Sequence, residues 1–203
     1  MMPSAALADA PLSQKPLDDL LADAVALHGH LCPGVVLGTR MVTVGCRAIG
    51  LDQPRTAGKD LVVLVEIDRC ATDAVQAVTG ASLGKRTLKH LDYGKMAATF
   101  VNVPRDAAVR VSVREEARWL ARSWAPGEPD ARKAQTAAYR VMPEADLFKV
   151  ERVVVDPSWL DRRRARVFCQ ACGEAINYRR ELSVGGRTLC RTCAGDSYYA
   201  RLS

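Results

Sequence analysis

Hydrophobic residues recur at helical spacing in the first quarter of the chain. Leucines, alanines and a valine across residues 17–27 follow one another at intervals of three and four, which predicts an amphipathic helix that ends near Gly29. A second apolar stretch, from Pro33 to about Ile49, has hydrophobic residues on most sides and predicts a buried helix. Gly38 and Gly45 fall near one face of that helix, so we expect another backbone to pack closely there.

The pattern then changes to one typical of a strand. Residues 60–67 form a β-branched run bounded by polar residues, which predicts a buried strand. Thr72 and Asp73 supply the start signals of a helix that stops at Gly80. Cys70 therefore lies between a strand end and a helix start, where layered α/β proteins commonly place ligands.

More strands and helices follow in the second half of the core. Three short strands are expected at 88–92, 97–103 and 107–113, and the tight links between them favour antiparallel pairing. Helices are expected at 114–123 and 130–141, and a last strand at 149–155. Helices, then a mostly antiparallel sheet, then helices predict an α+β core over residues 16–160, preceded by a mobile tail over residues 1–15.

Two Cys-x-x-Cys pairs mark the C-terminal segment. Seventeen residues separate the first pair from the second, which is the spacing of a four-cysteine zinc site: Cys169, Cys172, Cys190 and Cys193. Gly185-Gly186 predicts a hairpin between residues 176 and 189, and residues 194–202 are expected to form a short helix, the element order of a treble clef. Because so short a segment has little core of its own, we expect residues 161–203 to fold around a structural zinc ion.

A second cluster of residue types that bind metals surrounds Gly29. The segment from His28 reads His-Gly-His-Leu-Cys-Pro-Gly, and Pro33 suits the first turn of a helix. Cys32 then lies at or beside a helix N-terminus, where unpaired N–H groups favour an anion such as a thiolate. One interpretation is structural, with His28 and His30 capping a helix and Cys32 packing beside the proline. Imidazole and thiolate together favour zinc or a similar ion.

Composition and charge limit the cellular compartments and the kinds of partner that we expect for this protein. The net charge is +6, but residues 161–203 carry nine arginines against four carboxylates, so the first 160 residues are nearly neutral. Four thiolates on one zinc ion add about two negative charges, which leaves the segment mildly basic. No apolar run approaches about 20 residues and the N-terminus lacks a signal-peptide pattern, so we expect a cytoplasmic protein without a membrane span. The seven cysteines then suit metal binding better than disulfides.

Three sequence blocks in this order resemble the FmdE family, whose members are described as the FmdE component of formylmethanofuran dehydrogenase, with an appended treble-clef zinc finger. The blocks run from His28 to Arg40, from Glu66 to Gln76 and from Gly80 to Lys95. The resemblance implies a cytoplasmic metal-binding protein, often a homodimer, associated with the protein subunits of a molybdenum or tungsten enzyme. It also implies a cleft around the His-x-His-x-Cys motif and the second cysteine motif.

The resemblance carries over to individual residues. The candidate ligands of a core metal ion are His28, His30, Cys32 and Cys70. The candidates for hydrogen-bonding these ligands or attracting an anion are Arg40, Asp73, Gln76 and Lys85. Family members often carry a further cysteine where this chain has Ala81, so a redox pair between that position and Cys70 is excluded.

Three functions stay open at this point. The first is an accessory metalloprotein of an oxidoreductase system, whose zinc finger docks a partner. The second is a stand-alone enzyme that uses Cys32 or Cys70 as a nucleophile or a cleft metal that activates water. The third is a nucleic-acid-binding regulator that uses the basic C-terminal segment. We favour the first.

Overall fold

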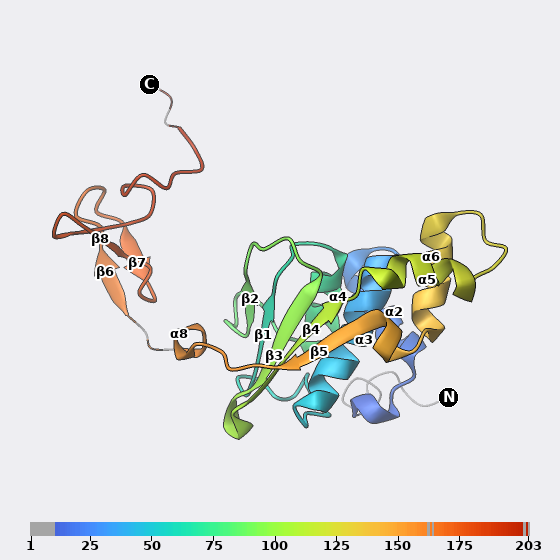
Figure 1. Cartoon of the computed structure of the whole chain (residues 1–203). Helices are drawn as coiled ribbons and strands as arrows, with labels where there is room; N and C mark the ends of the chain where they lie inside the picture. The colour runs from blue at the N-terminus through green and yellow to red at the C-terminus, as the bar shows by residue number, and fades with distance from the viewer. Residues whose placement is uncertain (1–10, 162, 164, 201, 203) are drawn as a thin grey trace. The chain divides into compact units, whose positions relative to one another are not determined.

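The computed structural model describes residues 11–161, 163, 165–200 and 202, and the chain divides into two compact units between Val155 and Asp156. The first unit combines a helical layer with a five-stranded sheet, and the second holds the four-cysteine segment on two short hairpins (Figure 1). This is the predicted α+β class with a mostly antiparallel sheet. Among the described helices, none combines the length and apolar character needed to cross a bilayer.

Two helices form at the N-terminal side of the core as the hydrophobic spacing predicts. Helix α2 covers Leu17–His28 and ends at Gly29, whose left-handed φ of 95° closes the helix. Helix α3 covers Pro33–Ala48, with Cys32 as its N-cap residue in an extended conformation. Most of α3 is buried, which confirms the expectation of an internal helix.

A third helix packs against α3 at unusually short range. Helix α4 covers Cys70–Thr79. A Cβ atom added to Gly38 would lie 2.6 Å from the Cα and the carbonyl oxygen of Ala71, and one added to Gly34 would lie 2.9 Å from the Cβ of Cys70. The close backbone approach expected at Gly38 is therefore confirmed, whereas Gly45 instead faces the ring of Phe100.

The sheet of the first unit has the strand order β2-β1-β3-β4-β5. Its strands are β1 Leu61–Val65, β2 Leu88–His90, β3 Ala97–Asn102, β4 Ala107–Val113 and β5 Phe148–Arg152. Every residue of β1 is buried, as its uninterrupted apolar run predicts. Helix α3 packs against β3 and β4, so the sheet supports the helix that carries Cys32 (Figure 1).

The pairing of β2 differs from the prediction. The short links favour an antiparallel β2–β3 pair, but β2 instead pairs with β1 in parallel, with Val63 opposite Leu88. The reason is that α4 connects β1 to β2 and returns the chain to the same end of the sheet, as in other crossover units. The other pairs, β1–β3, β3–β4 and β4–β5, are antiparallel.

Five further elements complete the described part of the first unit. They are η1 Leu12–Gln14, η2 Val103–Arg105, α5 Glu116–Trp124, α6 Ala131–Val141 and α7 Glu144–Leu147. Asp130 caps α6 by accepting hydrogen bonds from the backbone N–H groups of Arg132 and Lys133. Residues 1–10 of the predicted mobile tail lie outside the described residues, and Ser13, further along, hydrogen-bonds to Asp52.

The second unit contains α8 Pro157–Leu160, β6 Arg166–Phe168, β7 Ala175–Asn177, β8 Leu182–Val184 and β9 Arg187–Leu189. The hairpin at Gly185-Gly186 joins β8 to β9, as predicted. Its first arm is shorter than expected because Tyr178 and Arg179 have left-handed φ angles of 61° and 58° and separate β7 from β8. The short helix expected over 194–202 is wrong for the described residues, which form turns around Gly195 at a φ of 102°.

We predict that Gly38→Ala lowers the free energy of unfolding by about 2 kcal/mol, because the new methyl group meets the backbone of Ala71. This net value combines a steric cost of about 3 kcal/mol with the gain of about 1 kcal/mol that alanine brings to a helix. Chemical denaturation of the full chain measures it. Gly84→Ala is the matched control, since nothing lies within 4 Å of a Cβ at Gly84. Equal stability of the two variants would show that the α3–α4 contact tolerates expansion.

Candidate metal centres

The second unit brings its four cysteines to one point. The sulfur atoms of Cys169, Cys172, Cys190 and Cys193 all lie within 4.8 Å of one another. Those of Cys172 and Cys190 are 3.9 Å apart, close to the edge of about 3.8 Å expected for a tetrahedron with zinc–sulfur bonds of about 2.3 Å. The sulfur positions therefore fit a tetrahedral zinc ion.

The electrostatics of this cluster also call for a cation. Backbone N–H groups of Cys172 and Cys190 lower the pKa of Cys169 to about 6. The neighbouring thiols of Cys190 and Cys172 raise the pKa of Cys193 to about 12. Thiolates this close repel one another, so full deprotonation needs a positive ion among them. Among the described residues of this unit, Ile176 and Leu189 are buried with Cys169, and Val167 and Ala194 are partly buried against them, a core too small to fold the unit alone.

A second cluster lies in the first unit, where three helix ends meet. His28 is the last residue of α2, Cys32 precedes α3 and Cys70 begins α4. One ligand atom from each of these residues lies within 4.8 Å of the other two. The Nε2 atom of His28 is 3.8 Å from the Sγ atom of Cys32. One imidazole and two thiols at these distances form a set suited to zinc or a similar ion.

The orientation of the His28 ring is set by α4. The Nδ1 atom of His28 lies 2.7 Å from a carboxylate oxygen of Asp73. Since an ionised carboxylate only accepts, this contact makes Nδ1 the donor, and the tautomer with its proton on Nδ1 has the Nε2 lone pair on the side of Cys32. This carboxylate–histidine arrangement is the one found behind many metal-ligating histidines.

The other predicted ligands lie differently. His30 is outside the close group, and its ring lies 4.7 Å from that of His28, centroid to centroid. The carbonyl of Gln76 accepts the N–H of Gly80 at the end of α4. Burial raises the pKa of the Cys70 thiol, and the adjacent thiol of Cys32 adds to the effect. The structure thus brings together His28, Cys32 and Cys70, with Asp73 behind the histidine.

The two predicted cations donate to main-chain carbonyls. Arg40 donates from Nη1 to the carbonyl oxygens of Tyr139 and Met142 at 2.8 and 2.6 Å, so it closes the C-terminal end of α6. Its burial lowers the pKa of the guanidinium. Lys85 donates from Nζ to the carbonyl of Gly80 at 3.1 Å. Arg40 thus ties α3 to α6, and Lys85 bonds at the end of α4 opposite Cys70; a ligand role for either stays a prediction.

A cavity of about 510 Å³ opens beside the two sulfurs of the first unit. Cys32 and Cys70 line it, together with polar side chains from the α5–α6 region: Glu115, Arg118, Arg132, Gln135 and Tyr139. No sequence pattern singled out these residues. They occur singly in two amphipathic helices, at no spacing that marks a site, and only the packing of α6 on α3 brings them near the cysteines.

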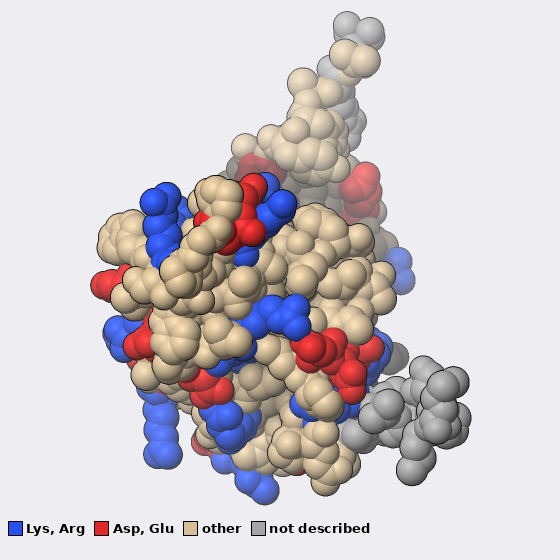
Figure 2. All heavy atoms as spheres, turned by 90° about the vertical axis from the view of Figure 1, so that its right-hand side faces the viewer, with Lys and Arg blue, Asp and Glu red and all other residues tan. Residues whose placement is uncertain are grey.

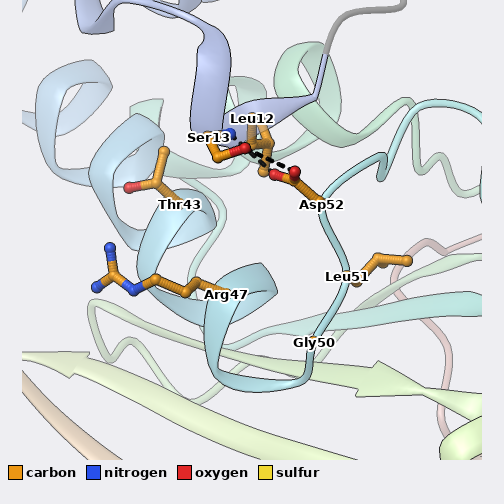
Figure 3. Close-up of a pocket in the computed structure, with 7 residues that line it drawn as sticks. All are labelled: Leu12, Ser13, Thr43, Arg47, Gly50, Leu51 and Asp52. Carbon is orange, nitrogen blue, oxygen red and sulfur yellow. Dashed lines mark hydrogen bonds between the residues drawn. The ribbon is translucent and has the colours of Figure 1, made fainter.

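Another hollow, of about 350 Å³, lies at the opposite end of α3 (Figure 3). Ser13 and Asp52 hydrogen-bond to each other on its wall, and the Arg47 side chain points away from them (Figure 3). Arg47 is ion-paired with Glu144. Since this wall is largely apolar and its charged groups pair with other residues, we place no chemistry there.

The comparisons with known proteins agree with this architecture. A family model described as FmdE, Molybdenum formylmethanofuran dehydrogenase operon, matches residues 27–149, more than half of the 203 residues. The chain belongs to the FmdE family. A model described as the prokaryotic dksA/traR C4-type zinc finger matches residues 162–199 of this FmdE-family chain.

Two individual proteins are similar to this FmdE-family chain. A protein of Archaeoglobus fulgidus described as a probable S-adenosyl-L-methionine-binding protein is 34% identical, over 92% of this chain and 55% of its own length. The chain thus spans about half the length of that relative. The crystal structure of a tungsten formylmethanofuran dehydrogenase FmdE-like protein from Syntrophus aciditrophicus has a TM-score of 0.62 and 22% identity, covering 94% of this chain and 99% of that one. At this identity the likeness concerns the fold.

We predict that Cys169→Ser removes one zinc equivalent per chain and exposes the second unit to protease, because its apolar cluster is too small to fold alone. Metal analysis of the purified full chain and limited proteolysis measure both effects. Cys46→Ala is the control, since Cys46 is buried in the core of the first unit and belongs to neither cluster. Unchanged zinc content in the Cys169 variant would rule out the four-sulfur site.

Proposed function

We propose that this FmdE-family chain is an accessory metalloprotein whose core binds a transition-metal ion through His28, Cys32 and Cys70. One observation carries the proposal: three ligand atoms lie within 4.8 Å of one another, and both cysteines line a cavity of about 510 Å³. A buried structural cluster has no need of such a cavity. Metal sites that act on other molecules keep an open position of this kind.

The donor set limits which ions and which chemistry fit. Two sulfurs and one nitrogen suit zinc and other borderline or soft divalent ions better than magnesium or calcium. Three protein ligands leave a fourth position of a tetrahedral ion, and the cavity lies on the side of the two sulfurs. When bound, such an ion would supply a Lewis-acidic position to whatever occupies the cavity. Asp73 holds the His28 ring in the ligating orientation.

We propose that the zinc finger docks the chain to a protein partner. The three core ligands all come from the first unit, and the finger forms a compact unit of its own. The description of the family model names the operon of molybdenum formylmethanofuran dehydrogenase, which supports an association with the subunits of such an enzyme. A homodimer and a cytoplasmic location are parts of the same proposal, whereas the treble-clef form is not, because the described residues after Cys193 form turns where its helix would lie.

The charge distribution does not favour nucleic acid as the partner. In the second unit Asp161 pairs with Arg163 and Arg179, and Asp196 pairs with Arg191, so several arginines have carboxylate partners. On the face shown in Figure 2, which belongs mainly to the first unit, basic and acidic side chains are interspersed without a continuous basic area. A groove for a phosphate backbone would need such an area.

The name of the Archaeoglobus relative raises S-adenosylmethionine as a ligand for the same cavity. The volume of about 510 Å³ suits a molecule of that size. The lining suits it less well: the carboxylate of S-adenosylmethionine matches an arginine, but its sulfonium and ammonium groups give it a net positive charge, and the cavity is lined by Arg69, Arg118 and Arg132 against one carboxylate, Glu115. We therefore do not extend that ligand to this chain.

We predict that Cys32→Ala and His28→Ala each lower the metal content by one equivalent while the four-cysteine site stays loaded, because each removes one of three core ligands. Metal analysis after dialysis at neutral pH measures the loss. His30→Ala is the matched control, since His30 stands beside His28 but outside the ligand group. A metal content that is the same in all three variants and the wild-type chain would overturn the proposed function.

Asp73→Asn gives a finer test of the same site. The amide keeps the shape of the carboxylate but loses its charge, so the His28 ring becomes a weaker ligand. We expect the affinity for the core metal to fall by about 10- to 100-fold with no change at the four-cysteine site. Competition with a coloured chelator measures both affinities, and a core affinity equal to that of the wild-type chain would show that Asp73 has no role there.

A further inference from the structure

The cavity beside the core cysteines carries an excess of positive charge. Arg69, Arg118 and Arg132 line it, and Glu115 is the single carboxylate among its lining residues. Within the described part of the chain, no ion pair or side-chain hydrogen bond engages any of these three guanidinium groups. Elsewhere in the same unit, Arg47, Arg55, Arg110 and Arg140 all have carboxylate partners. The cavity therefore gathers three arginines against one lining carboxylate. Asp130, the N-cap residue of α6, also interacts electrostatically with Arg132, but it does not line the cavity.

These arginines come from separate elements that meet at the cavity. Arg69 immediately precedes α4 and is next to Cys70. Arg118 lies in the first turn of α5, and Arg132 is the second residue of α6. Cys32 stands at the start of α3, so residues at the N-terminal ends of four helices line the same cavity. Three of these helix starts also carry a carboxylate, Asp73 on α4, Glu116 on α5 and Asp130 before α6, so the positive charge of the cavity comes from the guanidinium groups.

We propose that the cavity binds a small organic oxyanion, a carboxylate or a phosphate ester, with Arg118 and Arg132 as its main counter-charges and Arg69 as the one nearest the sulfurs. Guanidinium groups bind both kinds of anion through paired N–H donors. The volume of about 510 Å³ accommodates a whole metabolite-sized molecule, and because Cys32 and Cys70 line the same cavity, such a ligand would also have room to offer a second donor atom to the core metal. In this respect the inference rests on the proposed function, since it names the class of ligand that the metal meets.

The test uses the full-length, metal-loaded chain and two probes, inorganic phosphate and succinate, in separate calorimetric titrations at one low ionic strength. Two probes distinguish a phosphate-bearing ligand from a carboxylate-bearing one. Arg118→Gln and Arg132→Gln are each expected to weaken binding of the preferred probe by about tenfold, because each removes a charge-assisted hydrogen-bond donor. Both side chains are exposed, so the variants are expected to fold normally, which thermal melting checks.

Two further variants test whether the change in anion affinity depends on the charge of the cavity and on residues that line it. Glu115→Gln is expected to tighten binding, because it removes the one negative charge that faces the anion. Arg122→Gln is the matched control, since Arg122 is an exposed arginine of α5 that does not line the cavity. Weaker binding in the Glu115 variant, an equal loss in the Arg122 variant, or no binding of either probe to the wild-type chain would each overturn the inference.

The same titrations on Cys32→Ala separate this inference from the proposed function. If the core metal takes part, the Cys32 variant binds the preferred probe more weakly than the wild-type chain, and Arg118→Gln weakens binding in both backgrounds. If the proposed function fails, metal content and anion affinity are both unchanged by Cys32→Ala, while the arginine effects persist. If the inference fails, the metal is lost as proposed and neither arginine variant alters the affinity.

Discussion

The direct approach of two helix backbones at Gly38 underlies the rest of the first unit. A side chain at this position would collide with the main chain of Ala71, so glycine is what lets α3 and α4 touch along their first turns. Gly34, one turn earlier on α3, lies against Cys70 in the same way. Because Cys32 precedes α3 and Cys70 begins α4, the distance between the two thiols follows from this helix contact. The cysteines meet because two glycines leave them room.

The two metal centres illustrate two ways of gathering ligands. In the second unit each Cys-x-x-Cys turn supplies its own pair of sulfurs, and one hairpin brings the pairs together. In the first unit three helix ends supply one ligand each, and a fourth side chain, Asp73, aims the imidazole. The arrangement in the second unit depends on local spacing, and the arrangement in the first unit depends on tertiary packing. A buried scaffold of this kind holds its ligands in place whether or not an ion is present.

This difference explains how much could be predicted from sequence. The zinc finger was predictable because all of its ligands occur at fixed local spacings. Periodicity also predicted α2, α3 and β1, whose faces are buried in the expected way. It did not predict the parallel pairing of β2, because the sequence of a strand does not show that the preceding connection crosses over through α4. His28 and Cys32 could be recognised as one motif, whereas choosing His28 over His30 required the position of Asp73. The arginines of the cavity had no sequence signal, because single charged residues on amphipathic helices are ordinarily surface groups.

The two core cysteines lie far apart in the sequence, and this separation has a kinetic consequence. Cys32 and Cys70 are separated by the whole of α3 and β1, so a single ion bonded to both would close a large loop of chain. Unfolding of this region would then require a metal–sulfur bond to break, and the lifetime of the folded core would follow the residence time of its ion. Opening of the helix pair would then have to wait for release of the metal, whereas release of the metal would leave the packed helices closed.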